Sequence, residues 1–240
     1  MKVAVCVGGI TYPDSEPLMG ALQQKFPQYD FFFGVWKGRE NELSTKLNAW
    51  SFEEHKPTYH PYLDVDLPGM ARKVSVIRED MKTKSRRLAP LIEKAPHQTK
   101  QIMMHSHMLD MIPPEYDMIV RTRFDIKFID NNNIDWEALI EKSYNENRAI
   151  GIAKKFPHMP QMFDPKGDPK WGWRLWEGYV MDLIMFHPRK LFDKELMLSL
   201  HESQTLLAAE FGWYQILSQP FSDNHQNYMC DISITSRDDK

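Results

Sequence analysis

Apolar positions along the chain fall into two patterns, unbroken runs that are typical of buried strands and four-residue spacings that are typical of helices. Residues 3–7 and 29–36 form two such runs, and the second is strongly aromatic. Between them, Ser-Glu-Pro at residues 15–17 opens a predicted helix that extends to about residue 26, with a buried stripe of Leu18, Leu22 and Phe26. A strand, a helix and a second strand at the start of a chain predict an α/β fold with a parallel sheet.

The same two patterns continue through the rest of the chain. Further helices are predicted at about residues 41–50, 71–84, 97–111, 135–143, 188–192 and 201–217. Further strands are predicted at about residues 58–63, 116–120, 126–129, 149–153, 178–186 and 228–234. In the helix at 97–111, Ile102, Met103, Leu109 and Met111 form the apolar side, and His105 lies elsewhere. We expect one large domain or two small ones, with a mostly parallel central sheet flanked by helices.

The stretch at residues 116–129, YDMIVRTRFDIKFI, joins an apolar strand to a second alternating run. Asp125 stands where the first strand ends, and Arg121 and Arg123 precede it. An aspartate offers hard oxygen ligands to Mg²⁺ or Mn²⁺, and arginine offers forked donors to phosphate oxygens. The stretch therefore fits a site for a metal-bridged diphosphate. It fits equally well a structural Arg–Asp pair that closes a turn, and the sequence leaves both interpretations open.

The first strand runs into Gly8, Gly9, Ile10, Thr11 and Tyr12. Two glycines at this point let the backbone turn tightly or approach a ligand closely, and an ordinary turn is the simpler interpretation. If the loop lines a nucleotide site, the Tyr12 ring can stack on the base. The sequence contains neither GxGxxG nor GxxxxGK[ST], which removes the main support for a dinucleotide-binding fold or a P-loop.

A long segment at residues 154–177, rich in Pro, Gly, Lys and Trp, has the length of a lid or a binding loop. Trp171, Trp173 and Trp176 lie in it at spacings that one face of a strand cannot bury. Indole rings beside carboxylates suit a sugar site, and a small hydrophobic cluster under the loop explains them equally well. Asp182 follows inside an apolar run, where a carboxylate is unfavourable unless it is paired, bound to a ligand or at the sheet margin.

The composition narrows the class of protein. A formal net charge of −3, with no long Lys or Arg block, disfavours broad nucleic-acid binding. Cys6 and Cys230 lie far apart, so neither a disulfide framework nor a zinc-finger spacing is present. No apolar run approaches about 18 residues, and the N-terminal run is too short for a signal peptide. We expect a soluble protein in a reducing, cytoplasmic setting, with no integral membrane segment and no nucleic-acid partner.

The stretch YDMIVRTRFDIKF resembles the pattern yD.viR.R.D..f of small nucleotide-sugar-dependent glycosyltransferases of the GT-A fold, of the viral and bacterial polysaccharide types. The helix before it and the segment GYVMDLIMFHPRKLFD after it resemble the corresponding segments of these enzymes. The resemblance spans roughly residues 3–217 in element order, and only the central motif is distinctive. It implies a single GT-A-like domain over residues 1–240, with a Rossmann-like, mostly parallel central sheet flanked by helices. The nucleotide-binding half would be residues 1–125 and the acceptor-binding half residues 126–240.

The resemblance also implies roles for individual residues. Asp125 would bind Mn²⁺ or Mg²⁺, and Arg123 replaces the first acidic residue of the family's metal motif, so fewer protein ligands hold the cation. Asp182 would face the acceptor, either as the general base or as an anchor for the acceptor hydroxyl, and Glu177 is the second candidate for the base. The residues that would bind the nucleotide-diphosphate sugar are Gly8, Gly9, Thr11, Tyr12, Gln101, Arg121 and Arg123. Those that would bind a glycan or other hydroxyl acceptor are Trp171, Trp173 and Trp176.

Two other functions compete with glycosyl transfer. A non-catalytic carbohydrate-binding or assembly protein on the same scaffold would use the segment at 171–176 alone, and would bind sugar without nucleotide or metal. An α/β nucleotide enzyme of another kind, such as a methyltransferase, is weakened because no GxGxG loop follows the first strand.

Overall fold

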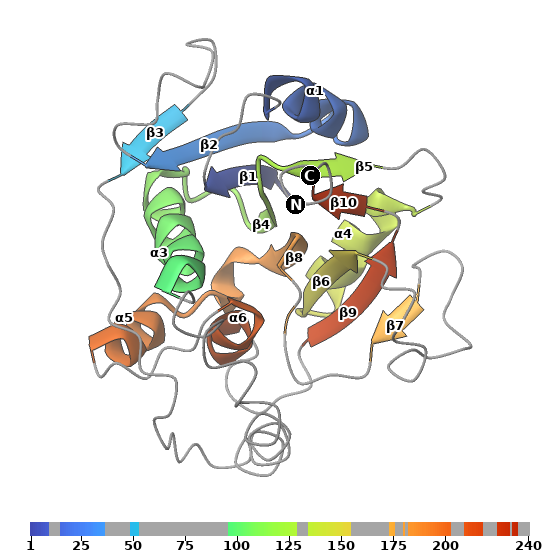
Figure 1. Cartoon of the computed structure of the whole chain (residues 1–240). Coiled ribbons are helices and arrows are strands. Elements are labelled where there is room, and N and C mark those ends of the chain that lie inside the picture. Colours follow the sequence, from blue (N-terminus) through green and yellow to red (C-terminus); the bar gives the residue numbers. More distant parts are fainter. Residues whose placement is uncertain are drawn as a thin grey trace, which may run out of the picture.

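The structure of the chain is a computed structural model in which eight strands form one sheet between two layers of helices (Figure 1). It describes residues 1–9, 15–36, 49–52, 96–128, 134–154, 173–175, 180, 182–202, 209–217, 225–230 and 232–234. The helix predicted at 71–84 and the strand predicted at 58–63 lie outside these residues. The helix predicted at 41–50 lies mostly outside them, and its last two residues belong to a strand instead.

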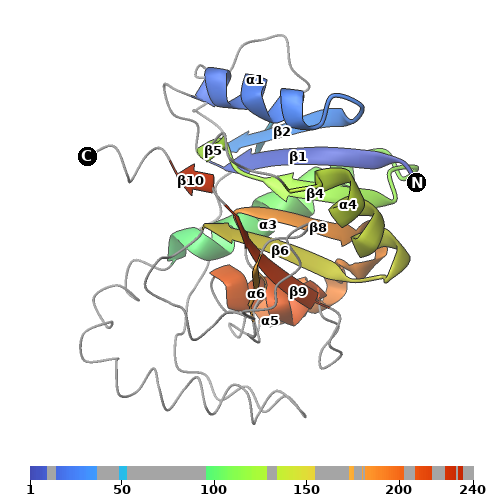
Figure 2. The ribbon, with the colours of Figure 1, turned by 90° about the vertical axis from the view of Figure 1, so that its right-hand side faces the viewer.

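The large sheet has the strand order β3-β2-β1-β4-β8-β6-β9-β7. Four of its seven neighbouring pairs are parallel, while β8 runs antiparallel to β4 and β6, and β7 runs antiparallel to β9. Figure 2 shows the arrow of β8 pointing against those of β1 and β6. A second, two-stranded sheet pairs β10 with β5. The strands are β1 (Val3–Gly9), β2 (Asp30–Trp36), β3 (Ala49–Phe52), β4 (Met118–Thr122), β5 (Ile126–Phe128), β6 (Ala149–Lys154), β7 (Trp173–Leu175), β8 (Ile184–Pro188), β9 (His225–Cys230) and β10 (Ile232–Ile234).

Alternate residues of the central strands face the two helical layers, as the period of two requires. Val3, Val5 and Val7 of β1 pack in one core with α1 (Ser15–Lys25) and α4 (Trp136–Asn145). Ala4 and Cys6 pack in another core with α3 (Pro96–Met111). On the α3 side of the sheet, a third core contains α5 (Lys194–Glu202) and α6 (Ala209–Leu217) (Figure 1). The predicted α/β class with a mostly parallel sheet is confirmed.

Two polar side chains fix helix ends. Asp135 is the N-cap of α4, and its carboxylate accepts a hydrogen bond of 2.9 Å from the backbone N–H of Ala138. Arg189 follows β8 in a 3₁₀ turn, Arg189–Leu191, and donates to the carbonyls of Leu109 and Ile112 at the end of α3. The last carbonyls of a helix have no partner inside it, so Arg189 both caps α3 and ties it to the end of β8.

The second half of the chain differs from its prediction in three places. β8 begins at Ile184, so Asp182 precedes the strand and does not lie in its middle. The helix predicted at 201–217 is not continuous, because α5 ends at Glu202 and α6 begins at Ala209. The edge strand predicted at 228–234 covers the end of β9 and all of β10, which are separate strands. β9 is not at the edge of the sheet, because it lies between β6 and β7. Within the described part of the chain, every helix is too short or too polar to span a membrane.

Candidate functional site

The order of the strands reverses between β1 and β4. The chain moves outward from β1 through β2 to β3 and then returns to place β4 on the other side of β1. In an open α/β sheet, ligands bind outside the carboxyl ends of the strands at such a reversal. Val7 of β1 is level with Thr122 of β4, so Gly9 and the residues that follow Thr122 flank this point from both sides.

The two glycines that end β1 have different reasons to be glycine. A Cβ on Gly8 would lie 3.1 Å from Sδ of Met108 and 3.2 Å from Cγ of Met104, so Gly8 lets α3 pack closely on the sheet. Gly9 has φ +133°, a conformation that side chains disfavour, and a Cβ there would meet no atom of the described residues within 4 Å. Gly9 therefore combines a special backbone with open space at the reversal point, and Gly8 is a packing residue.

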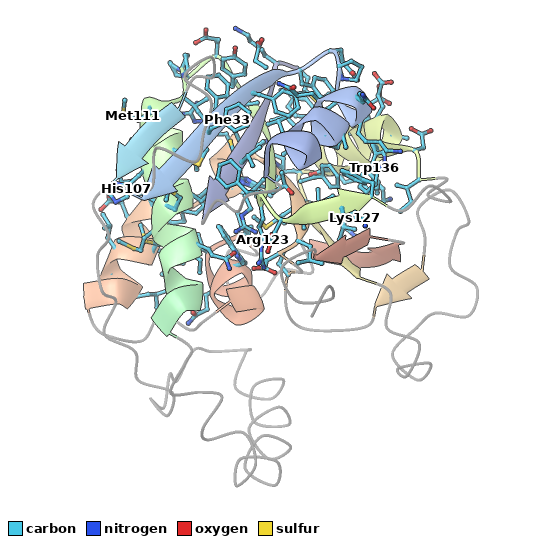
Figure 3. The ribbon with its side chains drawn as sticks, turned by 45° about the horizontal axis from the view of Figure 1, so that its top comes forward. Phe33, His107, Met111, Arg123, Lys127 and Trp136 are labelled. Atoms are coloured by element: carbon cyan, nitrogen blue, oxygen red, sulfur yellow. The ribbon has the colours of Figure 1, made fainter. Side chains whose placement is uncertain are left out.

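Arg123 and Asp125 form a bidentate ion pair in the turn after β4, where Figure 3 labels Arg123. Nε of Arg123 donates to Oδ1 of Asp125 at 2.9 Å, and Nη2 donates to Oδ2 at 2.7 Å. The Asp125 side chain is 2% exposed and that of Arg123 is 18% exposed. The structural Arg–Asp pair left open by the sequence is thus present, and it lies at the point where a ligand is expected.

Arg121 is a buried side chain of the site that contacts residues from three other parts of the fold. It is 3% exposed, and burial lowers its pKa to about 10, so it stays charged at neutral pH. Its guanidinium donates to the backbone carbonyl of Asp182 and to Oε1 of Gln101. Its Cζ lies 5.2 Å from the ring centre of Trp213, a cation–π contact from α6. Arg121 therefore joins β4, α3, α6 and the entry to β8.

Thr122 completes this connection, because its hydroxyl donates to the carbonyl of Leu183 at 3.0 Å. Arg121 and Thr122 are adjacent in β4, so their side chains point to opposite faces of the strand. Arg121 thus binds the carbonyl of Asp182 and Thr122 binds that of Leu183. The carboxylate of Asp182 has its Oδ2 3.8 Å from Nη1 of Arg121 and is 7% exposed. This is the pairing that a buried carboxylate needs, and it fixes the backbone that carries the predicted base.

A buried histidine pair lies behind Arg121, on the same face of the sheet. Nε2 of His105 in α3 and Nε2 of His187 in β8 are 3.0 Å apart. Nδ1 of His187 lies 3.0 Å from the Pro188 carbonyl oxygen, which only accepts, so Nδ1 carries the proton and Nε2 accepts from His105. Burial lowers the pKa of His187 to about 4. Burial, together with the charges of His187 and Arg121, holds the pKa of His105 well below its ordinary value.

Sequence reasoning missed several of these residues. His105 was expected away from the apolar side of its helix, yet it is 1% exposed and packs edge-on against the ring of Trp213. Met111, expected on the apolar side, is 51% exposed. Trp213 itself has a signal in the sequence, since Trp213, Ile216 and Leu217 follow the three- and four-residue spacing of a buried stripe.

The described part of the predicted acceptor-binding segment, β7, lies at the same edge of the sheet as Asp125 but several strands away from it. Pairing across β8, β6 and β9 places Arg174 of β7 level with Thr122 of β4. Four strand spacings of about 4.8 Å each put these strands about 19 Å apart. The backbone of Trp173 therefore lies at the carboxyl edge, well away from Asp125. The other predicted residues of the two loops lie outside the described residues: Thr11, Tyr12, Trp171, Trp176 and Glu177.

Asp125 has the chemistry of a divalent-cation ligand, a carboxylate with hard oxygen donors. Within the described ranges, no three His, Cys, Asp or Glu side chains gather as a metal site would need. A cation of the Mg²⁺ type is commonly held by one or two carboxylates with substrate phosphates and water as its other ligands. Asp125 fits that kind of site, provided that Arg123 yields at least one carboxylate oxygen.

The sequence matches no family model and no curated protein. Among solved structures, the chain is similar to 4-diphosphocytidyl-2C-methyl-D-erythritol synthase of Anaerococcus prevotii, with a TM-score of 0.50 and 9% identity over 99% of this chain and 94% of that chain. The chain has a Rossmann-like, GT-A-type fold. It is also similar to mouse xyloside xylosyltransferase 1, with a TM-score of 0.36 and 12% identity over 90% of this chain and 79% of that one. The second likeness is too low to carry an argument, and the first establishes the fold alone.

Proposed function

We propose that this chain is a glycosyltransferase that moves a sugar from a nucleoside-diphosphate sugar to a glycan or other hydroxyl acceptor. The observation that carries the proposal is the coincidence of two features at one place. The strand order reverses between β1 and β4, and the turn after β4 presents Arg123 and Asp125 there. A diphosphate needs charge-assisted donors, and an open α/β sheet offers its ligand site at this edge.

In the proposed mechanism the residues of the turn after β4 receive the diphosphate. The Arg123 guanidinium matches two phosphate oxygens as well as it matches the two oxygens of Asp125. Asp125 would hold a Mn²⁺ or Mg²⁺ ion, whose charge would stabilise the leaving diphosphate. Gly9 leaves room for the donor beside the end of β1.

Asp182 is the candidate general base, which takes the proton of the acceptor hydroxyl. Arg121 is a positioning residue in this mechanism, because it holds the carbonyl of Asp182 and lies near its carboxylate. The backbone of Trp173 lies along the same edge, farther from the donor, where an acceptor sugar can extend.

A thermal-shift screen of nucleotide sugars, with Mn²⁺ or with EDTA, tests the donor part of the proposal. We expect one nucleoside-diphosphate sugar to raise the melting temperature with Mn²⁺ present, and failure of every nucleotide to do so would contradict the proposal. Stabilisation by free sugars alone, unaffected by EDTA, would support a carbohydrate-binding protein instead.

The Asp182→Asn variant tests the base. Removing a general base lowers transfer by roughly 100-fold or more, while donor affinity stays within about twofold. Asp110→Asn is the matched control, since Asp110 is an exposed carboxylate paired with Lys194 at 2.6 Å on the outer part of α3. Equal transfer rates in Asp182→Asn and the wild type would exclude Asp182 as the base.

A further inference from the structure

We infer that Trp213 is a positioning residue of the candidate site, because it holds the Arg121 guanidinium where that group binds the carbonyl of Asp182. The inference rests on the proposed function, in which Asp182 is the candidate base, and adds to it a residue of α6 that acts through Arg121. It comes from the contacts of the guanidinium, the burial of the indole ring and the chain of rings that supports it.

The guanidinium of Arg121 has contacts from three parts of the fold. Nη1 donates to the carbonyl of Asp182, and Nη2 donates to Oε1 of Gln101 in α3. The third contact comes from α6, where the ring of Trp213 lies under Cζ with 5.2 Å between Cζ and the ring centre. The two hydrogen bonds fix the directions of the donors, and the indole ring limits how far the guanidinium can move toward α6.

The charge of Arg121 makes an aromatic neighbour favourable at this place. Oδ2 of Asp182 lies 3.8 Å from Nη1, while Asp125 and Arg123 act on the guanidinium with opposite signs. The face of an indole ring attracts a cation, and the attraction is stronger where water is excluded. An aliphatic side chain in place of Trp213 would leave this side of the guanidinium against hydrocarbon, so Arg121 would turn more easily toward another partner.

Trp213 is itself held firmly by the fold. Its side chain is buried in α6 and belongs to the core on the α3 side of the sheet. The ring of His105 packs edge-on against it, with ring centres 5.3 Å apart, and the ring of Phe192 lies tilted beside it at 6.4 Å. Because the indole ring is enclosed by other rings, it gives Arg121 a fixed surface to rest on.

This support begins and ends on the same strand. His105 lies within 3.0 Å of His187, near the C-terminal end of β8, and Asp182 precedes the N-terminal end of β8. From His187 the contacts pass through His105, Trp213 and Arg121 in turn, and they end at the carbonyl of Asp182. A change at Trp213 is therefore expected to reach the candidate base through Arg121.

A double-mutant cycle on the transfer rate tests the inference. The rate is the release of nucleoside diphosphate from the donor that the thermal-shift screen selects, with p-nitrophenyl glycosides as acceptors. Trp213→Leu should lower kcat roughly 10-fold or more, with the KM for the donor within about twofold of the wild type, because positioning affects the reacting geometry. In the Arg121→Met background the same change should alter kcat by less than about twofold, since its effect passes through Arg121. Trp213→Phe keeps an aromatic face and should hold kcat within about threefold of the wild type.

Ile216→Ala is the matched control, because Ile216 is also buried in α6 and belongs to the same core as Trp213. It should lower the melting temperature by leaving a cavity, as Trp213→Leu does, but it should keep kcat within about twofold of the wild type. If Trp213→Leu does not fold, Trp213→Met has a longer and more adaptable apolar side chain and takes its place in the same cycle.

Four results would count against the inference. The same loss of kcat from Trp213→Leu with and without the Arg121 guanidinium overturns it, because Trp213 then acts independently of Arg121. An equal loss of kcat in Ile216→Ala also overturns it and leaves α6 with a packing role alone. A loss confined to the KM for the donor overturns it by making Arg121 part of donor binding. If the wild type releases no nucleoside diphosphate from any donor, the proposed function fails and the inference fails with it.

Discussion

The buried pair of His105 and His187 predicts a specific loss of stability in mild acid. The pKa of His187 is about 4 in the folded chain, against an ordinary value of 6.5. Between pH 6.5 and pH 4, therefore, His187 is protonated in the unfolded chain but stays neutral in the folded chain. Stability then falls as the pH falls, and the loss is complete once the pH reaches the folded pKa near 4.

The size of the effect follows from the pKa difference. Each unit corresponds to about 1.4 kcal/mol, so acidification from pH 7 to pH 5 should remove about 2 kcal/mol through His187 alone. The lowered pKa of His105 acts in the same direction. Against a typical total stability of roughly 5–15 kcal/mol, this is a large part.

Urea unfolding at pH 7, 6 and 5, followed by tryptophan fluorescence, measures the effect. His187→Gln removes the titrating group, so the free energy of unfolding of this variant should depend less on pH than that of the wild type, whatever its absolute value. His107→Gln is the control, because His107 lies two residues along the same helix, at its outer side (Figure 3). Equal pH dependence in the wild type and His187→Gln would refute the reasoning.

Three further variants test the packing and the hydrogen bonds around the site. Gly34→Ala places a Cβ 2.7 Å from Sδ of the buried Met108, so it should destabilise the fold by about 1–3 kcal/mol in urea unfolding, and Gly20→Ala, with nothing within 4 Å, should not. Arg189→Ala removes the cap from the last carbonyls of α3 and should cost about 1–3 kcal/mol, seen as a lower melting temperature, and an unchanged melting temperature would contradict the capping role. Arg121→Met leaves the carbonyl of Asp182 without its donor, so transfer should fall roughly 10- to 100-fold at saturating donor, and a change confined to KM would contradict a positioning role.

The first half of the sheet was predictable because its strands are apolar on both faces. Strands were predicted at residues 3–7, 29–36 and 116–120. The observed β1, β2 and β4 begin and end within two residues of these bounds. Helix α4 was predictable for a related reason, since Trp136, Leu139 and Ile140 mark its buried side and Asp135 caps it. In these segments the local pattern and the final environment agree.

The second half was less predictable because pairing between distant segments decides it. The apolar run before Ile184 reads as strand, yet the ladder between β4 and β8 begins only at the pair of Thr122 with Ile184. Helix α3 is buried on nearly every side, so an apolar stripe does not identify its inner face, and His105 was misplaced for that reason.

The candidate site shows the same division. The sequence drew attention to Arg121, Arg123, Asp125 and Asp182, and the structure places all four along one edge of the sheet. The cation–π contact between Arg121 and Trp213 was not predictable from the sequence. The two residues are 92 positions apart and meet only through the fold, so no local pattern links them. The choice between a metal ligand and a structural pair for Asp125 was open in the sequence, and the structure shows the pair with Arg123.

The position of β8 has a consequence for how the chain reaches its native state. This strand is inserted between β4 and β6, both of which precede it in the chain and are therefore synthesised before it. Until residues 184–188 emerge from the ribosome, the apolar edge of β4 has no partner, and an uncovered strand edge invites association with other chains. Truncated products that end before this strand should therefore aggregate more readily than products that contain it.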